Sequence, residues 1–135
     1  ANSEEFNDTG AHVVHYMLGQ SREGTKGGSM RLGAYDCQIT EGTLAHKIYA
    51  KLRASERHRH RLEVNNHFVE KIRDAGMVIS GVNPDLDLVE LVELSDHPYF
   101  IGCQYHPEFN SRPYAPHPLF QSFIGASNQY RKERT

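Results

Sequence analysis

Three consecutive apolar segments near the end of the chain limit most strongly what it can fold into. MVISGV (77–82), LVELVEL (88–94) and YFIGCQY (99–105) are each short and rich in residue types that favour strands. NPDLD (83–87) separates the first two and SDHP (95–98) the last two. Both connections contain aspartate and proline, which favour turns. The pattern therefore predicts three successive strands.

The preceding part of the chain alternates strand and helix patterns. Further strands are expected at residues 12–18, 30–39 and 58–64, and residues 19–29, with four glycines, are expected to form an exposed loop. Helices are expected at 43–52, with Thr40 or Thr43 as N-cap, at 67–75, with Asn65 or Asn66 as N-cap and Gly76 following, and from Pro118 to the basic tail. This order predicts an α/β or α+β domain with a mixed sheet flanked by helices.

Periodicity also predicts which side of each helix is buried. Leu44, Ile48 and Leu52 fall on one face of the first helix, and the last helix has an apolar face of the same kind, formed by Leu119, Phe123 and Ala126. We expect both faces to pack on the sheet.

Composition excludes several classes of protein. The 135 residues suffice for one domain, and a net charge of -2 provides no basic field for nucleic acid. No apolar run approaches the roughly 18 residues of a membrane span. Two cysteines are too few for a disulfide framework, which favours a cytoplasmic location. The nine histidines lack metal-ligand spacing, so no metal site is expected.

The segment HPEF (106–109) carries the titratable pair His106 and Glu108 directly after a strand pattern. Histidine, with a pKa of about 6.5, is a natural general acid or base at neutral pH. Pro107 favours an extended backbone at His106, so that Glu108 points to the same side and can orient the imidazole. The alternative is an ordinary surface ion pair at a strand end.

A catalytic pair of this kind needs a nucleophile, and this sequence offers none. Strand alternation places Cys103 on the face opposite to His106, and Cys37 lies within a strand pattern. Neither has the sharp glycine-flanked turn that exposes a nucleophile, and no serine has a G-x-S-x-G context. We expect both cysteines to belong to the core.

Several longer motifs resemble the glutaminase domain of CTP synthase, a class I glutamine amidotransferase. The resemblance extends over essentially the whole chain, and its motifs are ANSEEF (1–6), GGSMRLG (27–33), ERHRHRLEVNN (56–66), DLVELVEL (87–94), HPYFIGCQYHPEF (97–109) and SRPYAPHPLFQSFIGAS (111–127). The resemblance implies the C-terminal half of a class I amidotransferase-like α/β domain.

The resemblance implies a function and roles for particular residues. In this family glutamine is hydrolysed to ammonia, which aminates UTP to CTP with ATP. His106 and Glu108 match two members of a Cys-His-Glu triad, and Glu5 and Arg61 match glutamine-binding positions. Without the family, Glu5 is read as a solvated terminal charge and Arg61 as part of an exposed basic strand.

GGSMRLG matches the end of a lid associated with activation by GTP, with Ser29 and Arg31 as the expected participants. No cofactor is expected in this chain, because ATP and Mg²⁺ bind the synthetase domain in the family. The family also implies a homotetramer. Ser29 stands where the family usually has threonine, and Tyr105 where phenylalanine is common.

The chain reads like the second half of a domain. The family's nucleophile elbow, its oxyanion strand and its synthetase domain would all precede Ala1. We therefore expect residues 1–135 to be a partial amidotransferase domain that is inactive alone. The alternative is a non-catalytic binding or regulatory module on the same scaffold, which would have to seal the sheet edge left by the missing strands.

Overall fold

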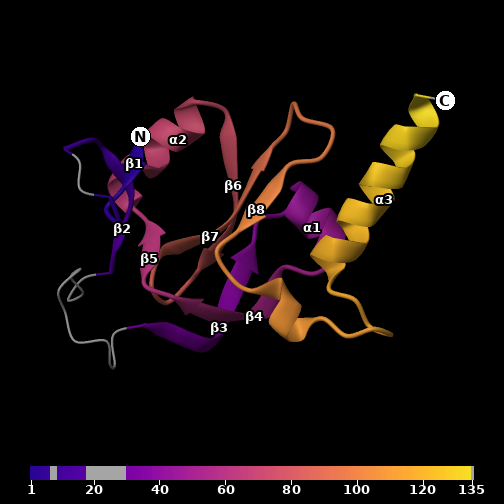
Figure 1. Ribbon diagram of the computed structural model, residues 1–135, viewed down its shortest axis with the longest axis horizontal. Coiled ribbons are helices and arrows are strands. Elements are labelled where there is room, and N and C mark those ends of the chain that lie inside the picture. The colour runs from indigo at the N-terminus through magenta and orange to yellow at the C-terminus, as the bar shows by residue number, and fades with distance from the viewer. Residues whose placement is uncertain (7–8, 18–29, 135) are drawn as a thin grey trace.

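The computed structural model describes residues 1–6, 9–17 and 30–134 (Figure 1). Its strands and helices, in chain order, are β1 Asn2–Ser3, β2 His12–Tyr16, β3 Arg31–Ile39, α1 Leu44–Tyr49, β4 Arg53–His60, β5 Leu62–Val64, the 3₁₀ helix η1 Asn66–Phe68, α2 Val69–Asp74, β6 Met77–Asn83, β7 Leu88–Leu94, β8 Ile101–Cys103, the 3₁₀ helix η2 Pro107–Asn110 and α3 Pro118–Glu133. None of the helices in these ranges is long and apolar enough to cross a membrane.

The larger sheet has the strand order β4-β3-β6-β7-β8, and every neighbouring pair in it is antiparallel. The three successive strands predicted near the end of the chain are therefore neighbours. The smaller sheet has the order β1-β2-β5, with β1 parallel and β5 antiparallel to β2. The α/β class is confirmed, and mixed pairing is confined to the smaller sheet.

The core lies between the larger sheet and the helices α1 and α3. Leu91 and Cys37 are fully buried there, and the remaining buried members are Ile39, Ala45, Tyr49, Ala54, Tyr105 and Leu119. Burying a side chain such as Leu91 contributes about 2 kcal/mol. At Gly81, a Cβ atom would lie 2.7 Å from the Cys37 Sγ atom, so the close approach of β6 to this cluster requires glycine.

The start of α1 is stabilised by its N-cap residue and by a contact from β7. The Thr43 side chain accepts a hydrogen bond from the His46 amide, as expected of an N-cap. In addition, the Glu93 carboxylate accepts hydrogen bonds from the amides of Leu44 (2.8 Å) and Ala45 (3.0 Å). Two amides that a helix cannot satisfy internally are thereby paired, and α1 is attached to the sheet.

Both predicted helix faces were partly wrong. In α1 the buried residues are Ala45 and Tyr49, and Leu52 lies beyond the helix with 48% of its surface exposed. The helix is only six residues long, which is too short for a stripe that ends at residue 52. In α3 only Leu119 is buried, and Phe123 is 55% exposed.

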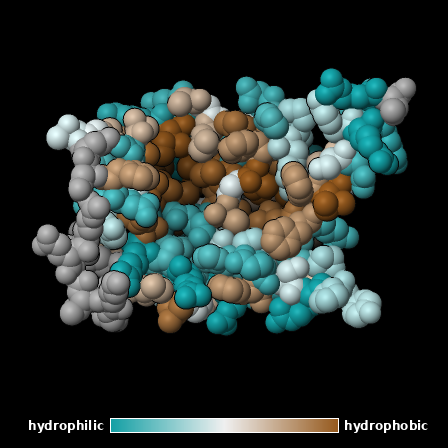
Figure 2. All heavy atoms as spheres, viewed as in Figure 1, coloured by the Kyte–Doolittle hydropathy of each residue, from teal (hydrophilic) through white to brown (hydrophobic). Residues whose placement is uncertain are grey.

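Apolar side chains also gather on one face of the molecule. Figure 2 shows them over β6, β7 and β8, between α2 and α3, with polar residues around this region. Strand β6 has residues of intermediate burial among its buried ones, and every residue of β8 is of intermediate burial. Part of the apolar surface of the larger sheet is therefore not covered.

Candidate active site

The segment that follows β8 crosses from β7 to β4, at the opposite edge of the larger sheet. The Gln104 amide donates to the Glu90 carbonyl at 2.9 Å, and two residues later the His106 amide donates to the Arg57 carbonyl at 2.8 Å. Between them the Tyr105 side chain is buried. Strand β8 ends at Cys103, earlier than predicted, because this crossing takes the chain out of the sheet. HPEF is thereby placed beside β4.

His106 and Glu108 are in direct contact. The Nδ1 atom of His106 lies 2.7 Å from the Oε1 atom of Glu108. The expected contact is present, but the expected extended backbone was wrong. His106 has φ -104° and ψ 87°, and Pro107–Asn110 form the 3₁₀ helix η2. Proline suits the first position of a helix because it has no amide hydrogen to satisfy there.

This arrangement leaves one ring nitrogen of His106 available. None of the described residues hydrogen-bonds to Nε2, while Nδ1 is held by Glu108. The ring stacks on Phe109, with centroids 5.1 Å apart and planes 20° apart. The hydrogen bond from His106 lowers the pKa of Glu108, so the carboxylate stays ionised at neutral pH. A histidine so oriented can take up or release a proton at Nε2.

A buried carboxylate, Glu56 on β4, lies behind this pair. Its Oε1 atom accepts from the Tyr49 hydroxyl at 2.8 Å and contacts His117 Nε2 at 2.9 Å, and its Oε2 atom accepts from Asn110 Nδ2 at 3.0 Å. The hydroxyls of Tyr49 and Tyr105 are 2.7 Å apart. Burial raises the pKa of Glu56, but the hydrogen bonds from His117 and Tyr49 outweigh it, and its pKa is lower than usual. Sequence reasoning missed this cluster, because it expected the strand to begin at residue 58, whereas β4 begins at Arg53 and includes Glu56.

Strand β4 separates its histidines from its arginines, as alternation requires. His58 is buried, whereas Arg57 and Arg59 are exposed. His58 Nε2 contacts the Glu90 carboxylate at 2.7 Å, in a polar layer beneath the sheet. The histidines of RHRHR therefore face the interior.

Arg31 belongs to the same polar layer. It is 2% exposed, forms an ion pair with Glu90 and lies 3.4 Å from the Glu63 carboxylate, and its guanidinium stacks over Tyr35. A cation that binds phosphate in a mobile lid has to reach solvent, and Arg31 does not. The structure therefore favours a structural role for Arg31 over the lid role expected from the sequence. Ser29 lies outside the described residues.

The two predicted glutamine-binding residues lie by the smaller sheet. Glu5 is exposed and follows β1. Arg61 joins β4 to β5, and its carbonyl accepts from the Met17 amide at 3.3 Å. No hydrogen bond among the described residues joins Glu5 or Arg61 to His106 or Glu108. Their roles stay predictions.

Neither cysteine is placed as a nucleophile. Burial raises the pKa of both thiols to about 12. Cys37 is fully buried, and the Cys103 Sγ atom lies 3.5 Å from the Tyr105 carbonyl. Both thiols are therefore protonated at neutral pH and cannot attack an amide.

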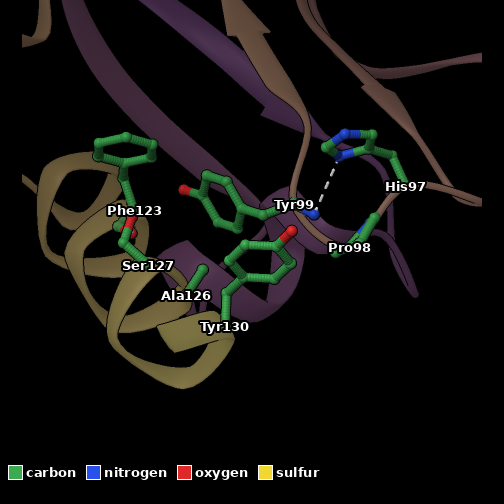
Figure 3. Close-up of a pocket in the computed structure, with 7 residues that line it drawn as sticks. All are labelled: His97, Pro98, Tyr99, Phe123, Ala126, Ser127 and Tyr130. Atoms are coloured by element: carbon green, nitrogen blue, oxygen red, sulfur yellow. Dashed lines mark hydrogen bonds between the residues drawn. The ribbon is translucent and has the colours of Figure 1, made fainter. Parts of the chain in front are cut away.

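The described surface also has an apolar groove of about 310 Å³ between α3 and the turn before β8. Figure 3 shows the rings of Tyr99, Phe123 and Tyr130 around it, and the Tyr99 amide donates a hydrogen bond to the His97 side chain. No predicted site residue lines this groove. Among the described residues, no three His, Cys, Asp or Glu side chains are grouped to hold a metal ion.

Comparison with known proteins places this geometry in a family. The pattern of the family described as glutamine amidotransferase class-I matches residues 6–126. The chain belongs to the class-I glutamine amidotransferase family. The likeness to CTP synthase is also confirmed, because 52% of positions are identical to CTP synthase of Geobacter metallireducens over the whole chain and 25% of that protein. CTP synthase of Methanothermobacter thermautotrophicus is 54% identical over 94% of this chain and 24% of that protein.

A solved structure shows the same amidotransferase fold. It is the glutaminase domain of Trypanosoma brucei CTPS with bound acivicin, and it is similar to this chain with a TM-score of 0.84 and 39% identity. The match covers 95% of this chain and 50% of that one. This amidotransferase chain thus spans about a quarter of the curated relatives and half of the solved domain.

Proposed function

We propose that this chain supplies the acid–base half of a glutaminase site in a CTP synthase, which releases ammonia from glutamine for the ATP-dependent amination of UTP. The observation that carries the proposal is the contact between His106 Nδ1 and Glu108 at 2.7 Å, with Nε2 available. The family and the likeness to a glutaminase domain support glutamine as the substrate.

In this mechanism the nucleophile is a cysteine outside the present chain, because desolvation raises the pKa of both Cys37 and Cys103 to about 12 and keeps them protonated. His106 Nε2 takes the proton of that thiol, and the thiolate attacks the amide carbon of glutamine. The same nitrogen then protonates the departing ammonia, which leaves a glutamyl thioester. His106 next takes a proton from water, whose oxygen attacks the thioester carbonyl. The C–S bond breaks, glutamate is released, and His106 returns the proton to the departing cysteine thiolate. Glu108 holds the tautomer and stabilises the imidazolium in each step.

The remaining half of a glutaminase domain is the proposed partner of this chain. The chain matches half of a solved glutaminase domain, and apolar residues over β6, β7 and β8 are uncovered in it (Figure 2). Covering this surface with a second set of elements would bury it, and the same elements would bring the thiol to His106. On this proposal the chain is inactive by itself. Glu5 and Arg61 complete the glutamine site, and GTP activates it.

The test is the substitution His106→Ala in the complete enzyme. We expect glutamine-driven CTP formation to be abolished, while CTP formation from free ammonia continues, because that reaction needs no glutaminase. His97→Ala is the matched control, since His97 is an exposed histidine outside the predicted site. Survival of glutamine-driven activity in His106→Ala would refute the proposal.

A further inference from the structure

Both ends of the segment His106–Asn110 are attached to successive residues of β4. At the first end, the His106 amide donates to the Arg57 carbonyl at 2.8 Å. At the last end, Asn110 Nδ2 donates to the Ser55 carbonyl at 3.3 Å and to the Glu56 carboxylate at 3.0 Å. The His106–Glu108 pair lies within this closed segment, so its position depends on β4.

The pair has little to hold it in place by itself. Its side chains are 37% and 55% exposed, and η2 is a single short turn of 3₁₀ helix without a side-chain cap. Short 3₁₀ helices have poor hydrogen-bond geometry, and exposed pairs of charged side chains lose much of their attraction to solvent and side-chain motion. A persistent contact between His106 and Glu108 therefore requires attachment from outside η2.

Glu56 provides this attachment from the interior. Glu56 is 3% exposed. Its carboxylate accepts hydrogen bonds from Asn110, the last residue of η2, and from His117, the N-cap of α3. It also accepts a hydrogen bond from the Tyr49 hydroxyl. That hydroxyl in turn contacts the hydroxyl of Tyr105, the residue before His106. The chain before and after the pair thus converges on one carboxylate.

We propose that Glu56 is a positioning residue for the glutaminase reaction, acting on His106 and Glu108 through Asn110. The inference rests on the proposed function, but Glu56 itself touches neither substrate nor reacting atoms. The two carboxylate oxygens of Glu56 can accept hydrogen bonds from Tyr49, Asn110 and His117 at once. A glutamine in this place cannot, because its amide nitrogen only donates. Loosening the attachment weakens the Nδ1 contact with Glu108, which stabilises the imidazolium.

The experiment compares Asn110→Ala and Glu56→Gln with Asn66→Ala in the complete enzyme. Asn66 is a matched control, because its exposed side chain also donates to a carbonyl, that of Asp87 at 2.6 Å. We expect the first two variants to lower kcat with glutamine about 10- to 100-fold, with KM nearly unchanged. A fall in kcat at constant KM indicates that the variants impair the reaction steps served by His106 rather than the binding of glutamine.

Two results would overturn the inference. One is that Asn110→Ala behaves like Asn66→Ala. The other is that it loses activity through a raised KM with kcat unchanged, as expected of an effect on glutamine binding alone. Because Asn110 is exposed, this variant decides the question even if thermal melting shows that Glu56→Gln does not fold. His106→Ala, measured in parallel, separates the two proposals. If His106→Ala keeps glutaminase activity, the proposed function is refuted. If His106→Ala is inactive but Asn110→Ala and Glu56→Gln behave like wild type, only the positioning role of Glu56 is refuted.

Discussion

Arg31 and Glu90, 59 residues apart in the sequence, form an ion pair from which solvent is excluded. Glu90 also contacts His58, and Arg31 lies within 3.4 Å of Glu63 on the smaller sheet. The pair therefore connects β3 and β7 of the larger sheet to β5 of the smaller one. A buried charge without its partner is costly, so each member of this group depends on the others.

Removing the charge of Arg31 should strongly destabilise the protein. Arg31→Met leaves the buried carboxylates of Glu90 and Glu63 without their cation, and we expect a loss of about 3–5 kcal/mol in the free energy of unfolding. Urea titration measures it. Arg59→Ala is the control, since Arg59 is exposed on the neighbouring strand β4 and its loss should change stability by less than about 0.5 kcal/mol. A stable Arg31→Met variant with an altered GTP response would instead support the lid role.

Replacing the orienting carboxylate should impair glutamine hydrolysis without affecting the ammonia-driven reaction. Glu108→Gln keeps the size of the side chain but removes the charge that stabilises the imidazolium. We expect kcat with glutamine to fall about 10²-fold or more. Steady-state assays of the complete enzyme with glutamine and with ammonia measure both reactions. Unchanged glutamine kinetics would reduce the His106–Glu108 contact to a surface ion pair.

The contribution of Glu56 to stability should depend on pH in a defined direction. Its folded-state pKa lies below the usual 4.5, so the stabilisation is fully present above about pH 4.5 and is lost as pH falls through the lower folded value. The free energy of unfolding of the wild type should exceed that of Glu56→Gln by about 2 kcal/mol at pH 7 and pH 5. This difference should shrink below pH 4.5. Urea titrations at pH 7, 5, 4 and 3 test this. A difference that grows towards acid would contradict the assignment.

The two thiols should resist alkylation in the native protein. With pKa values of about 12, Cys37 and Cys103 contain far less thiolate at pH 7.5 than an ordinary thiol does. We expect iodoacetamide to modify them at least about 100-fold more slowly than in urea-unfolded protein, as followed by intact mass. Rapid modification of native Cys103 would return it to consideration as a nucleophile.

The sequence predicted several elements and the contact at HPEF, for local reasons. The strand expected at 58–64 was wrong, because β4 begins at Arg53 and the chain passes at Arg61 into β5 of the other sheet. Apolar segments with turns between them specified β6 and β7, Thr43 and Pro118 marked helix starts, and the spacing of His106 and Glu108 predicted their contact. The motifs also predicted the amidotransferase family, which is confirmed over residues 6–126. The roles of Glu5, Arg61 and Ser29 stay predictions.

What the sequence determined by itself was thus local: alternation, caps, turns and one titratable pair within three residues. Only the tertiary structure decided which charges are buried and what they meet. Glu56 and His117 come together across 61 residues, and Arg31 turns inward to Glu90 across 59. The physical reason is that a buried charge is stable only beside its partners, and no local pattern says which distant strand will bring them.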